Sequence, residues 1–311
     1  MNVRNSLVNP QWWDFTSLDQ ELINRASALS LQDLVALSSE YCDVRVYQNL
    51  DDMFLSQALE YITAWQKATA DKPAGLCGPV GPVRQMPIVA KLVNELNINL
   101  QHCHFWGMDE WCIDGKAVDR SHPLSFAGAN YRLWYEQIKP ELRMPEEQLH
   151  FPDHSNLVEF SQSFADFHCV RMQGGLGHTL HWAFNDPVAR SGQYLDEPPT
   201  AEEYQALPAR FVKLHPISQI QNATGLTGRD PTRVPDEAVT VGPKETFLCD
   251  EVSIWYPGQN QNPFGIRLAI LMVAEKMKSS LVPVSVLADH PKVTFHIYGP
   301  SITSCESAIS A

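Results

Sequence analysis

Apolar and polar residues along this chain form short stretches whose spacing switches between a period of two and a period near 3.6. Residues 43–47 (Asp-Val-Arg-Val-Tyr) alternate with period two, which predicts a strand. Residues 51–69 then have helical spacing. The apolar positions on one face of that helix are Met53, Leu55, Ala58, Leu59 and Ile62.

The same switching between strand and helix continues to the end of the chain. We expect further strands near 74–77, 104–106, 168–172, 238–241, 252–256 and 293–298. We expect helices near 88–96, 125–138 and 265–278, with a long polar connection over 186–236. Strands and helices in turn are typical of a mostly parallel sheet covered on both faces. The sequence therefore predicts an α/β, three-layer, Rossmann-like fold.

Residues 1–42 precede the first expected strand and have the pattern of a helical N-terminal extension, so 43–311 is expected to be the α/β domain. Ser30 is a predicted N-cap, with Asp33 in the first turn that follows. Trp12 and Trp13 are expected to be exposed on this extension, where they would suit the interface of a homo-oligomer.

Composition excludes several classes of protein. Hydrophobic residues make up 44% of the chain and charged residues 19%, which is enough apolar material for a large core and excludes a disordered chain. The net charge of −13 and the absence of a basic stripe exclude nucleic acid as a partner. No apolar run approaches the ~20 residues of a membrane span.

The N-terminus lacks the apolar stretch of a signal peptide. Seven cysteines, an odd number without C-x-x-C spacing, favour a reduced protein. We therefore expect a cytoplasmic protein that does not associate with membranes.

Loops that follow the strands are the expected place for chemistry, because open α/β sheets bind ligands beyond the carboxyl ends of their strands. The first such loop, 75–82, contains Gly78 and Gly81 and could hold phosphate with its backbone N–H groups. Pro79 and Pro82 remove two of those donors, and the loop has no Ser, Thr or Lys. A tight structural turn is an equally good interpretation.

A second loop places Asp109 and Glu110 directly after an apolar strand. If the strand continues, the two side chains point in opposite directions, so a turn must place either one in a cleft. A buried carboxylate there can move a proton on and off carbon. A solvated acidic pair is the simpler alternative.

A third loop, 174–187, contains Gly175 and Gly177, which let the backbone approach a ligand closely. His181 follows them and can act as an acid and a base near neutral pH, although a core histidine is the alternative. The triplet 102–104 (His-Cys-His) alternates across its strand, so we expect no metal site there.

In order along the chain, these segments resemble the glucosamine-6-phosphate deaminase (isomerase) family, which is related to 6-phosphogluconolactonases. Residues 108–111 (Met-Asp-Glu-Trp) resemble the family motif M-D-E-Y, and 174–187 resemble G-G-x-G-x-D-G-H-x-A-F-N-E-P. Weaker support comes from 121–125, 234–242 and 290–291. The resemblance runs from about residue 43 to 301, and its Ala-Phe-Asn-Asp-Pro ending favours the deaminase branch.

The resemblance implies isomerisation of an amino sugar phosphate from aldose to ketose with loss of ammonia. Asp109 then aligns with the carboxylate that carries the proton between C2 and C1, and Glu110 with its acidic neighbour. His181 aligns with the ring-opening histidine, and Asp186 with the carboxylate that orients it. The partner is a small sugar or sugar phosphate, and neither a metal nor an organic cofactor is implied.

The chain departs from the family pattern around the substrate, where Gly78, Gly81, Gly175, Gly177, Thr179 and Gln261 are the expected binding residues. Thr179 replaces an aspartate, and Asp186 is one methylene shorter than the usual glutamate. Gln261 stands where a phosphate-binding lysine is expected, and a phosphate-binding arginine has only Arg229 or Arg233 as replacements. Each lost cation forfeits contacts of about 1.5–3 kcal/mol.

We therefore expect a sugar isomerase or deaminase with an altered phosphate site. Two alternatives stay open. One is a non-catalytic sugar sensor of the same fold, favoured by Thr179 and the altered phosphate loop. The other is a hydrolase similar to 6-phosphogluconolactonase, which would form neither ammonia nor ketose.

Overall fold

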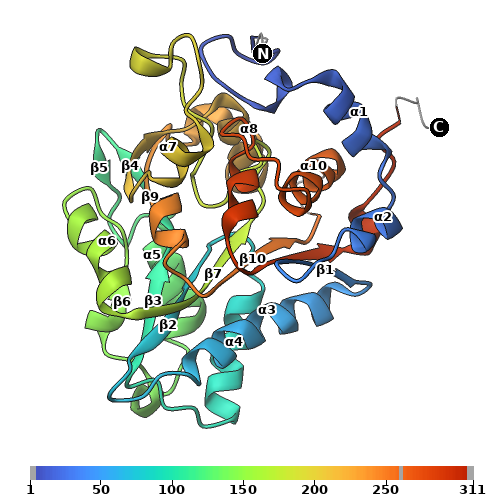
Figure 1. The fold of residues 1–311 in the computed structure, drawn as a ribbon. Helices are drawn as coiled ribbons and strands as arrows, with labels where there is room; N and C mark the ends of the chain where they lie inside the picture. Colours follow the sequence, from blue (N-terminus) through green and yellow to red (C-terminus); the bar gives the residue numbers. More distant parts are fainter. Residues whose placement is uncertain (1–4, 259–261, 307–311) are drawn as a thin grey trace.

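A seven-stranded sheet runs through the centre of the protein (Figure 1). The computed structural model describes residues 5–258 and 262–306, and every strand of this sheet runs parallel to its neighbours. Across the sheet, the strands are β1 (Cys42–Tyr47), β11 (Val293–Tyr298), β10 (Glu251–Tyr256), β7 (His168–Gly175), β2 (Ala74–Gly78), β3 (Cys103–Gly107) and β6 (Leu149–His150). The predicted α/β fold with a parallel central sheet is confirmed.

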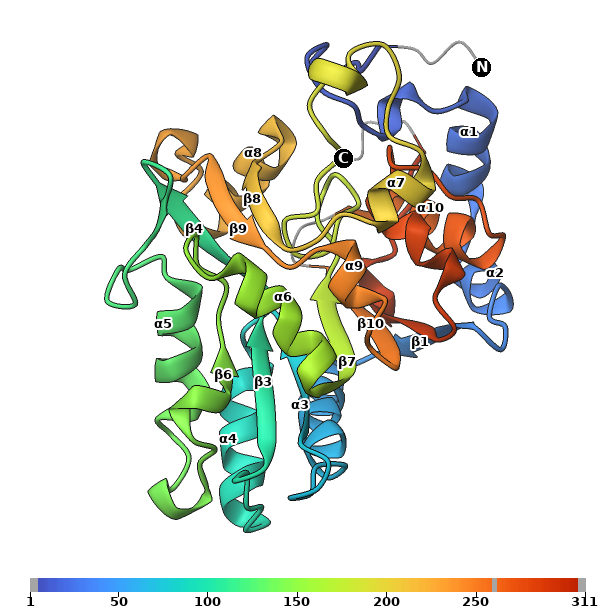
Figure 2. The same cartoon turned by 60° about the vertical axis from the view of Figure 1, so that its left-hand side comes forward.

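Helices cover both faces of this sheet (Figure 2). One face carries α3 (Leu50–Trp65) and α4 (Gln85–Glu95). The other carries α1 (Gln20–Ala28), α2 (Leu31–Ala36), α6 (Leu157–Asp166), α9 (Pro243–Thr246) and α10 (Pro263–Ala274). Because successive strand residues point to opposite faces, Leu76 and Phe105 lie in one core while Cys77 and Trp106 lie in the other.

A second, four-stranded antiparallel sheet follows directly from the first, and the sequence did not predict it. Its order is β5 (Lys116–Ala117), β4 (Asp109–Ile113), β9 (Glu237–Thr240) and β8 (Arg210–Lys213). Only Met108 separates β3 from β4, so the chain passes from one sheet to the other without a loop. The strand near 238–241 was correctly expected, but it belongs to this second sheet.

Several helices also differ from expectation. The stretch 186–236, expected to be a polar connection, contains α7 (Ala201–Gln205), β8 and α8 (Pro216–Leu226). The expected helix near 125–138 starts as α5 (Phe126–Asn130) and continues as a π-helical turn over Tyr131–Tyr135. Of these elements, α7 has five residues and β8 has four, and elements as short as these give little periodic signal.

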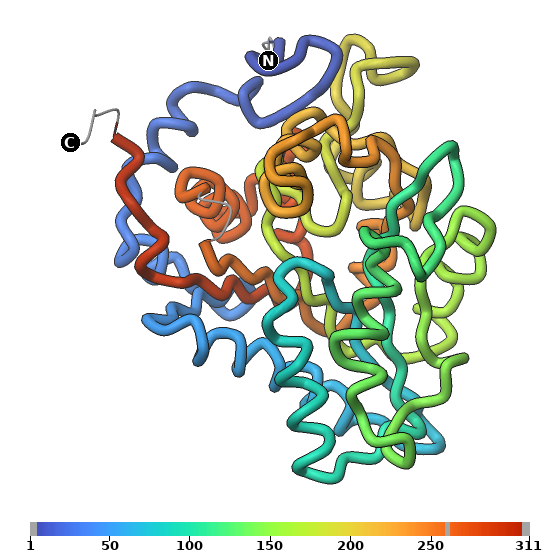
Figure 3. Tube along the Cα trace, turned by 180° about the vertical axis from the view of Figure 1, so that it is seen from behind, coloured from blue at the N-terminus to red at the C-terminus, as the bar shows by residue number. Residues whose placement is uncertain are grey.

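The N-terminal segment packs onto the domain (Figure 3). Trp12 forms an isolated antiparallel bridge with Ala189, and the Trp13 indole donates to the carbonyl of Tyr194. Trp12 is 9% exposed and Trp13 is 1% exposed, so the expectation of exposed interface tryptophans was wrong. The Trp12 ring instead contacts the ring of His215, and the guanidinium group of Arg190 lies over the Trp13 ring.

The predicted cap of α2 is confirmed. The Ser30 hydroxyl accepts from the backbone N–H of Asp33, and the Asp33 carboxylate accepts from the backbone N–H of Ser30. Among residues 5–258 and 262–306, no helix is long and apolar enough to cross a membrane.

We predict that Gly75→Ala destabilises the protein by about 1–3 kcal/mol or more. Gly75 lies in the middle of β2, and a Cβ there would sit 1.8 Å from the carbonyl oxygen of His104 in the neighbouring strand. Gly225→Ala is the matched control, since a Cβ there meets nothing within 4 Å. Urea unfolding of both variants measures the difference, and equal midpoints would contradict the prediction.

Candidate active site

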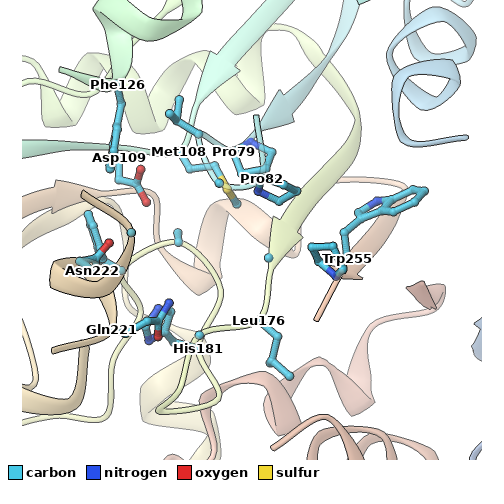
Figure 4. A pocket seen from close by; sticks show the side chains of 18 of the residues that line it. Pro79, Pro82, Met108, Asp109, Phe126, Leu176, His181, Gln221, Asn222 and Trp255 are labelled. Atoms are coloured by element: carbon cyan, nitrogen blue, oxygen red, sulfur yellow. The ribbon is translucent and has the colours of Figure 1, made fainter. Parts of the chain in front are cut away.

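The carboxyl ends of four strands meet around one pocket (Figure 4). Pro79–Pro82 follow β2, Met108 and Asp109 follow β3, Gly175–Gly177 end β7, and Trp255–Gly258 end β10. Helix α8 closes the remaining side with Gln221, Asn222, Gly225 and Leu226. The pocket holds about 1020 Å³, including its open mouth. Three loops that the sequence singled out are therefore neighbours in space.

Asp109 is the first residue of β4 and turns its carboxyl group into this pocket. The β4 backbone is held by pairing with β9, where Asp109 faces Thr240. The side chain is nearly buried, and that burial raises the pKa of Asp109 well above its usual range, with the neighbouring Glu110 adding to the rise. A raised pKa favours the protonated form, so this carboxyl group can return to a substrate a proton that it has taken up.

Glu110 points the other way, because the two residues are neighbours on a strand. Its carboxylate accepts from the Ser125 hydroxyl at 2.8 Å and from the backbone N–H groups of Phe126 and Ala127 at 2.9 Å. Burial raises the pKa of Glu110, and these hydrogen bonds oppose the rise. Glu110 does not line the pocket, so its placement does not support the expected catalytic role. It anchors the start of α5, from which Phe126 reaches the pocket wall.

His181 lines the pocket from the loop after β7. Its Nδ1 lies 2.6 Å from Oδ1 of Asp186. An ionised carboxylate only accepts hydrogen bonds, so in the neutral ring Nδ1 carries the proton and Nε2 keeps its lone pair. Nε2 lies against Gly177, where a Cβ would come within 2.2 Å of it. Glycine at 177 thus leaves this edge of the ring uncovered.

Asp186 lies behind His181, away from the pocket. Its Oδ1 also accepts from the hydroxyls of Thr179 and Ser218, both at 2.6 Å, and its Oδ2 accepts from the backbone N–H of His215 at 3.0 Å. Burial acts to raise the pKa of Asp186, but the contacts with His181, Ser218 and Thr179 outweigh it and hold that pKa below its usual range. Asp186 is therefore the ionised partner of His181.

Thr179 and Ser218 together support this pair. Thr179 was expected to bind substrate, but it does not line the pocket and is directed at Asp186 and at Nδ1 of His181, 2.6 Å away. Ser218 comes from α8 and was not predicted, because a serine 37 residues from the histidine belongs to no recognisable local motif. Two hydroxyls thus stand where the family pattern has an additional carboxylate.

A second set of contacts, made by His215 and Asp14, connects this site to the N-terminal segment. His215 accepts from the backbone N–H of Ile217 through Nδ1, so its Nε2 carries the proton and faces Oδ2 of Asp14 at 3.5 Å. Asp14 is wholly buried and also accepts from the hydroxyls of Ser6 and Thr16, both at 2.5 Å. Burial acts to raise the pKa of Asp14, but these partners lower it overall. No sequence pattern connects residues so far apart.

Only some of the remaining predicted binding residues line the pocket. Gly81, Gly175 and Gly177 line the pocket, whereas Gly78 ends β2 behind it, with its Cα facing Tyr61 and Phe105. Gln261 lies outside the described residues. Neither Arg229 nor Arg233 lines the pocket, and no Lys or Arg is found among its described lining residues.

No group of three or more potential metal ligands occurs within the described part of the chain. Of the His-Cys-His triplet, His104 instead contacts a second histidine, with its Nδ1 2.8 Å from Nε2 of His150. Burial lowers the pKa of His104 to about 4. The histidine pair is therefore part of the packed interior beside β3 and β6.

The pocket at the strand ends of this α/β fold thus combines a buried carboxyl group with a His–Asp pair. By sequence, the chain is 23% identical to glucosamine-6-phosphate deaminase from Actinobacillus pleuropneumoniae serotype 5b (strain L20) over 239 residues, which cover 72% of this chain and 77% of the relative. No family model matches the chain.

Solved structures show the same fold. A monomeric glucosamine-6-phosphate deaminase superimposes with a TM-score of 0.65 at 18% identity, covering 84% of this chain and 99% of the other. For 6-phosphogluconolactonase from Leishmania guyanensis, the TM-score is 0.57 at 12% identity, with 87% and 100% covered. The enzyme of that name from Thermotoga maritima gives 0.52 at 12% identity, with 83% and 99% covered. The chain therefore shares its fold with these deaminases and lactonases, and it is similar in sequence to the deaminase.

We predict that Asp109→Asn stabilises the protein at neutral and alkaline pH. A carboxyl group whose pKa is raised by folding costs stability as the pH rises from the unfolded pKa through the folded one, and the amide cannot ionise. The gain in the free energy of unfolding over wild type should therefore grow as the pH rises above the unfolded pKa of the carboxyl group. Urea unfolding at several pH values measures it.

Asp14→Asn is the matched comparison, because Asp14 is also buried but its pKa is lowered by folding. Such a carboxylate contributes stability above its unfolded pKa, and this contribution is lost as the pH falls through the folded pKa. We expect this variant to be less stable than wild type by about 1–3 kcal/mol at pH 7, since it replaces a buried carboxylate that accepts hydrogen bonds from the hydroxyls of Ser6 and Thr16. Equal effects of the two substitutions would contradict both assignments.

Proposed function

We propose that this protein is a sugar isomerase and deaminase, which converts an amino sugar from aldose to ketose with release of ammonia and has an altered phosphate-binding site. The observation that carries the proposal is that Asp109 and His181 line one pocket although they follow different strands. Asp109 is buried beside a second acidic residue, which raises its pKa, whereas His181 is hydrogen-bonded to the carboxylate of Asp186. The similarity to glucosamine-6-phosphate deaminases supports it.

In the proposed reaction, His181 first opens the sugar ring. Nε2 takes the proton of the C1 hydroxyl group and returns a proton to the ring oxygen, which leaves an open-chain aldehyde. The imidazolium formed in between is stabilised by Asp186, and Thr179 and Ser218 hold Asp186 in place. These residues therefore position the base, as general acid–base catalysis requires.

Asp109 then moves one proton. Its carboxylate removes the C2 proton while the aldehyde oxygen takes up a proton from water, which gives an enolamine. The resulting carboxylic acid delivers the C2 proton to C1 as the nitrogen releases a proton to water, which leaves a hydroxyl group at C1 and an imine at C2. Water adds to C2 and ammonia departs, giving the ketose. Burial suits Asp109 to both steps because the carboxyl group must be a base in the first and an acid in the second.

Other parts of the chain take supporting roles in this proposal. Glu110 positions α5 and with it Phe126 at the pocket wall. We further propose that residues 1–42 are an extension of the α/β domain 43–311 and that they support the site through Asp14 and His215.

Hydrolysis of a sugar lactone is the second candidate, because several solved relatives of this fold are named as 6-phosphogluconolactonases. A lactonase needs a base that activates water, and His181 backed by Asp186 has the geometry for it. Asp109 would have no proton to remove from carbon in that reaction. Formation of ammonia and ketose therefore separates the two candidates.

We predict that the protein in D₂O exchanges the C2 proton of glucosamine or of its 6-phosphate, observed by proton NMR. Asp109→Asn should slow the exchange by about 10²–10⁴-fold, because the proton carrier is lost. Asp71→Asn, at an exposed position away from the pocket, should exchange like wild type. Unchanged exchange in Asp109→Asn would remove Asp109 from the mechanism.

A further inference from the structure

The pocket has one polar side and one apolar side. Figure 4 shows Asp109, Gln221 and Asn222 on one side and Pro82 and Leu176 on the other. Pro79, Leu226 and Pro257 extend the apolar lining. Among the described lining residues, Asp109 is the only carboxyl group, and none is a lysine or an arginine.

Two arginines that are close in sequence to pocket residues make their contacts with other parts of the chain. Arg84 follows the Pro79–Pro82 loop, but it pairs with Asp51 at 2.9 Å and lies over the Phe54 ring. Arg267 in α10 is buried and donates to the carbonyl oxygens of Leu29 and Pro263. Neither guanidinium group is directed at a ligand in the pocket.

Backbone donors do not make up for the missing cations. Pro79 and Pro82 have no N–H group, so half of the residues between 79 and 82 have none. A phosphate dianion would also meet the unfavourable field of a chain with a net charge of −13. Taking such an anion from water without charged partners is costly.

The polar side offers neutral groups that match hydroxyls. Gln221 accepts the backbone N–H of His178 through Oε1 at 2.6 Å, which leaves its amide NH₂ as the group that can donate to a ligand. Asn222 donates through Nδ2 to the carbonyl of Ser218 at 2.8 Å, which leaves its Oδ1 to accept. A donor and an acceptor side by side suit sugar hydroxyls, because each hydroxyl both donates and accepts.

We infer that the substrate of this pocket is a sugar without a phosphate or other anionic group, whose hydroxyls are bound by Gln221 and Asn222. This inference rests on the proposed function and narrows its substrate class. The end of the sugar that does not react would lie against the apolar wall of Pro82 and Leu176.

Calorimetric binding of glucosamine and of glucosamine 6-phosphate to the full chain tests the inference without turnover. We expect glucosamine to bind at least about 10-fold more tightly, which corresponds to ~1.4 kcal/mol. Equal or tighter binding of the phosphate would overturn the inference, as would the absence of binding by both sugars. Exchange of the C2 proton, measured separately, decides the proposed function: exchange of the phosphorylated sugar alone would overturn the inference but leave the function standing.

Leu226→Lys provides a gain-of-binding test. Leu226 ends α8, lines the pocket and is 44% exposed, so a lysine fits there without burial and is favoured at a helix C-terminus. It should tighten binding of glucosamine 6-phosphate by about 10–100-fold, as a charge-assisted contact does. Leu226→Gln is the matched control and should give no such gain. A gain of the same size in both variants, or in neither, would overturn the claim that a missing cation sets the specificity.

Discussion

The 2.6 Å hydrogen bond between Nδ1 of His181 and Oδ1 of Asp186 depends on Asp186 remaining ionised while it is removed from water. Four separate parts of the chain contribute to that condition. The loop after β7 supplies Thr179, α8 supplies Ser218, the residue before α8 supplies the backbone of His215, and the N-terminal segment supports His215 through Asp14. If any of these donors moved, a buried charge would lose a partner.

The surroundings of Asp109, which lines the same pocket, favour the protonated carboxyl group instead of the ionised one. Its carboxyl group is buried beside a second acidic residue, and both influences favour the protonated form. One carboxyl group is thus held ionised and the other is driven towards neutrality. Pairs of titratable groups whose environments separate their pKa values are the arrangement from which acid and base roles arise. The fold supplies the environment of Asp109 through β4, whose alternation sends Asp109 inward and Glu110 to α5.

The sequence predicted the central sheet because its strands are apolar runs separated by helices with clear spacing. It also predicted that Asp109 and His181 would share a site, since both follow strands of a parallel sheet. It did not predict β8, which is short and half-exposed, or the second sheet that β8 completes. Ser218 and Asp14 were missed because their contacts join residues far apart in sequence. The tryptophans at 12 and 13 were misplaced because hydrophobicity alone does not say which surface will cover a ring.

Transfer of an isotope label tests the central claim most directly, that Asp109 carries a proton from C2 to C1 inside this pocket. Glucosamine labelled with deuterium at C2 would be incubated with the protein in ordinary water, and the products examined by deuterium NMR. We predict ketose with part of the label at C1 and the remainder in solvent. Recovery of the sugar with all of its label still at C2, from protein shown to be folded and to bind the sugar, would contradict the account.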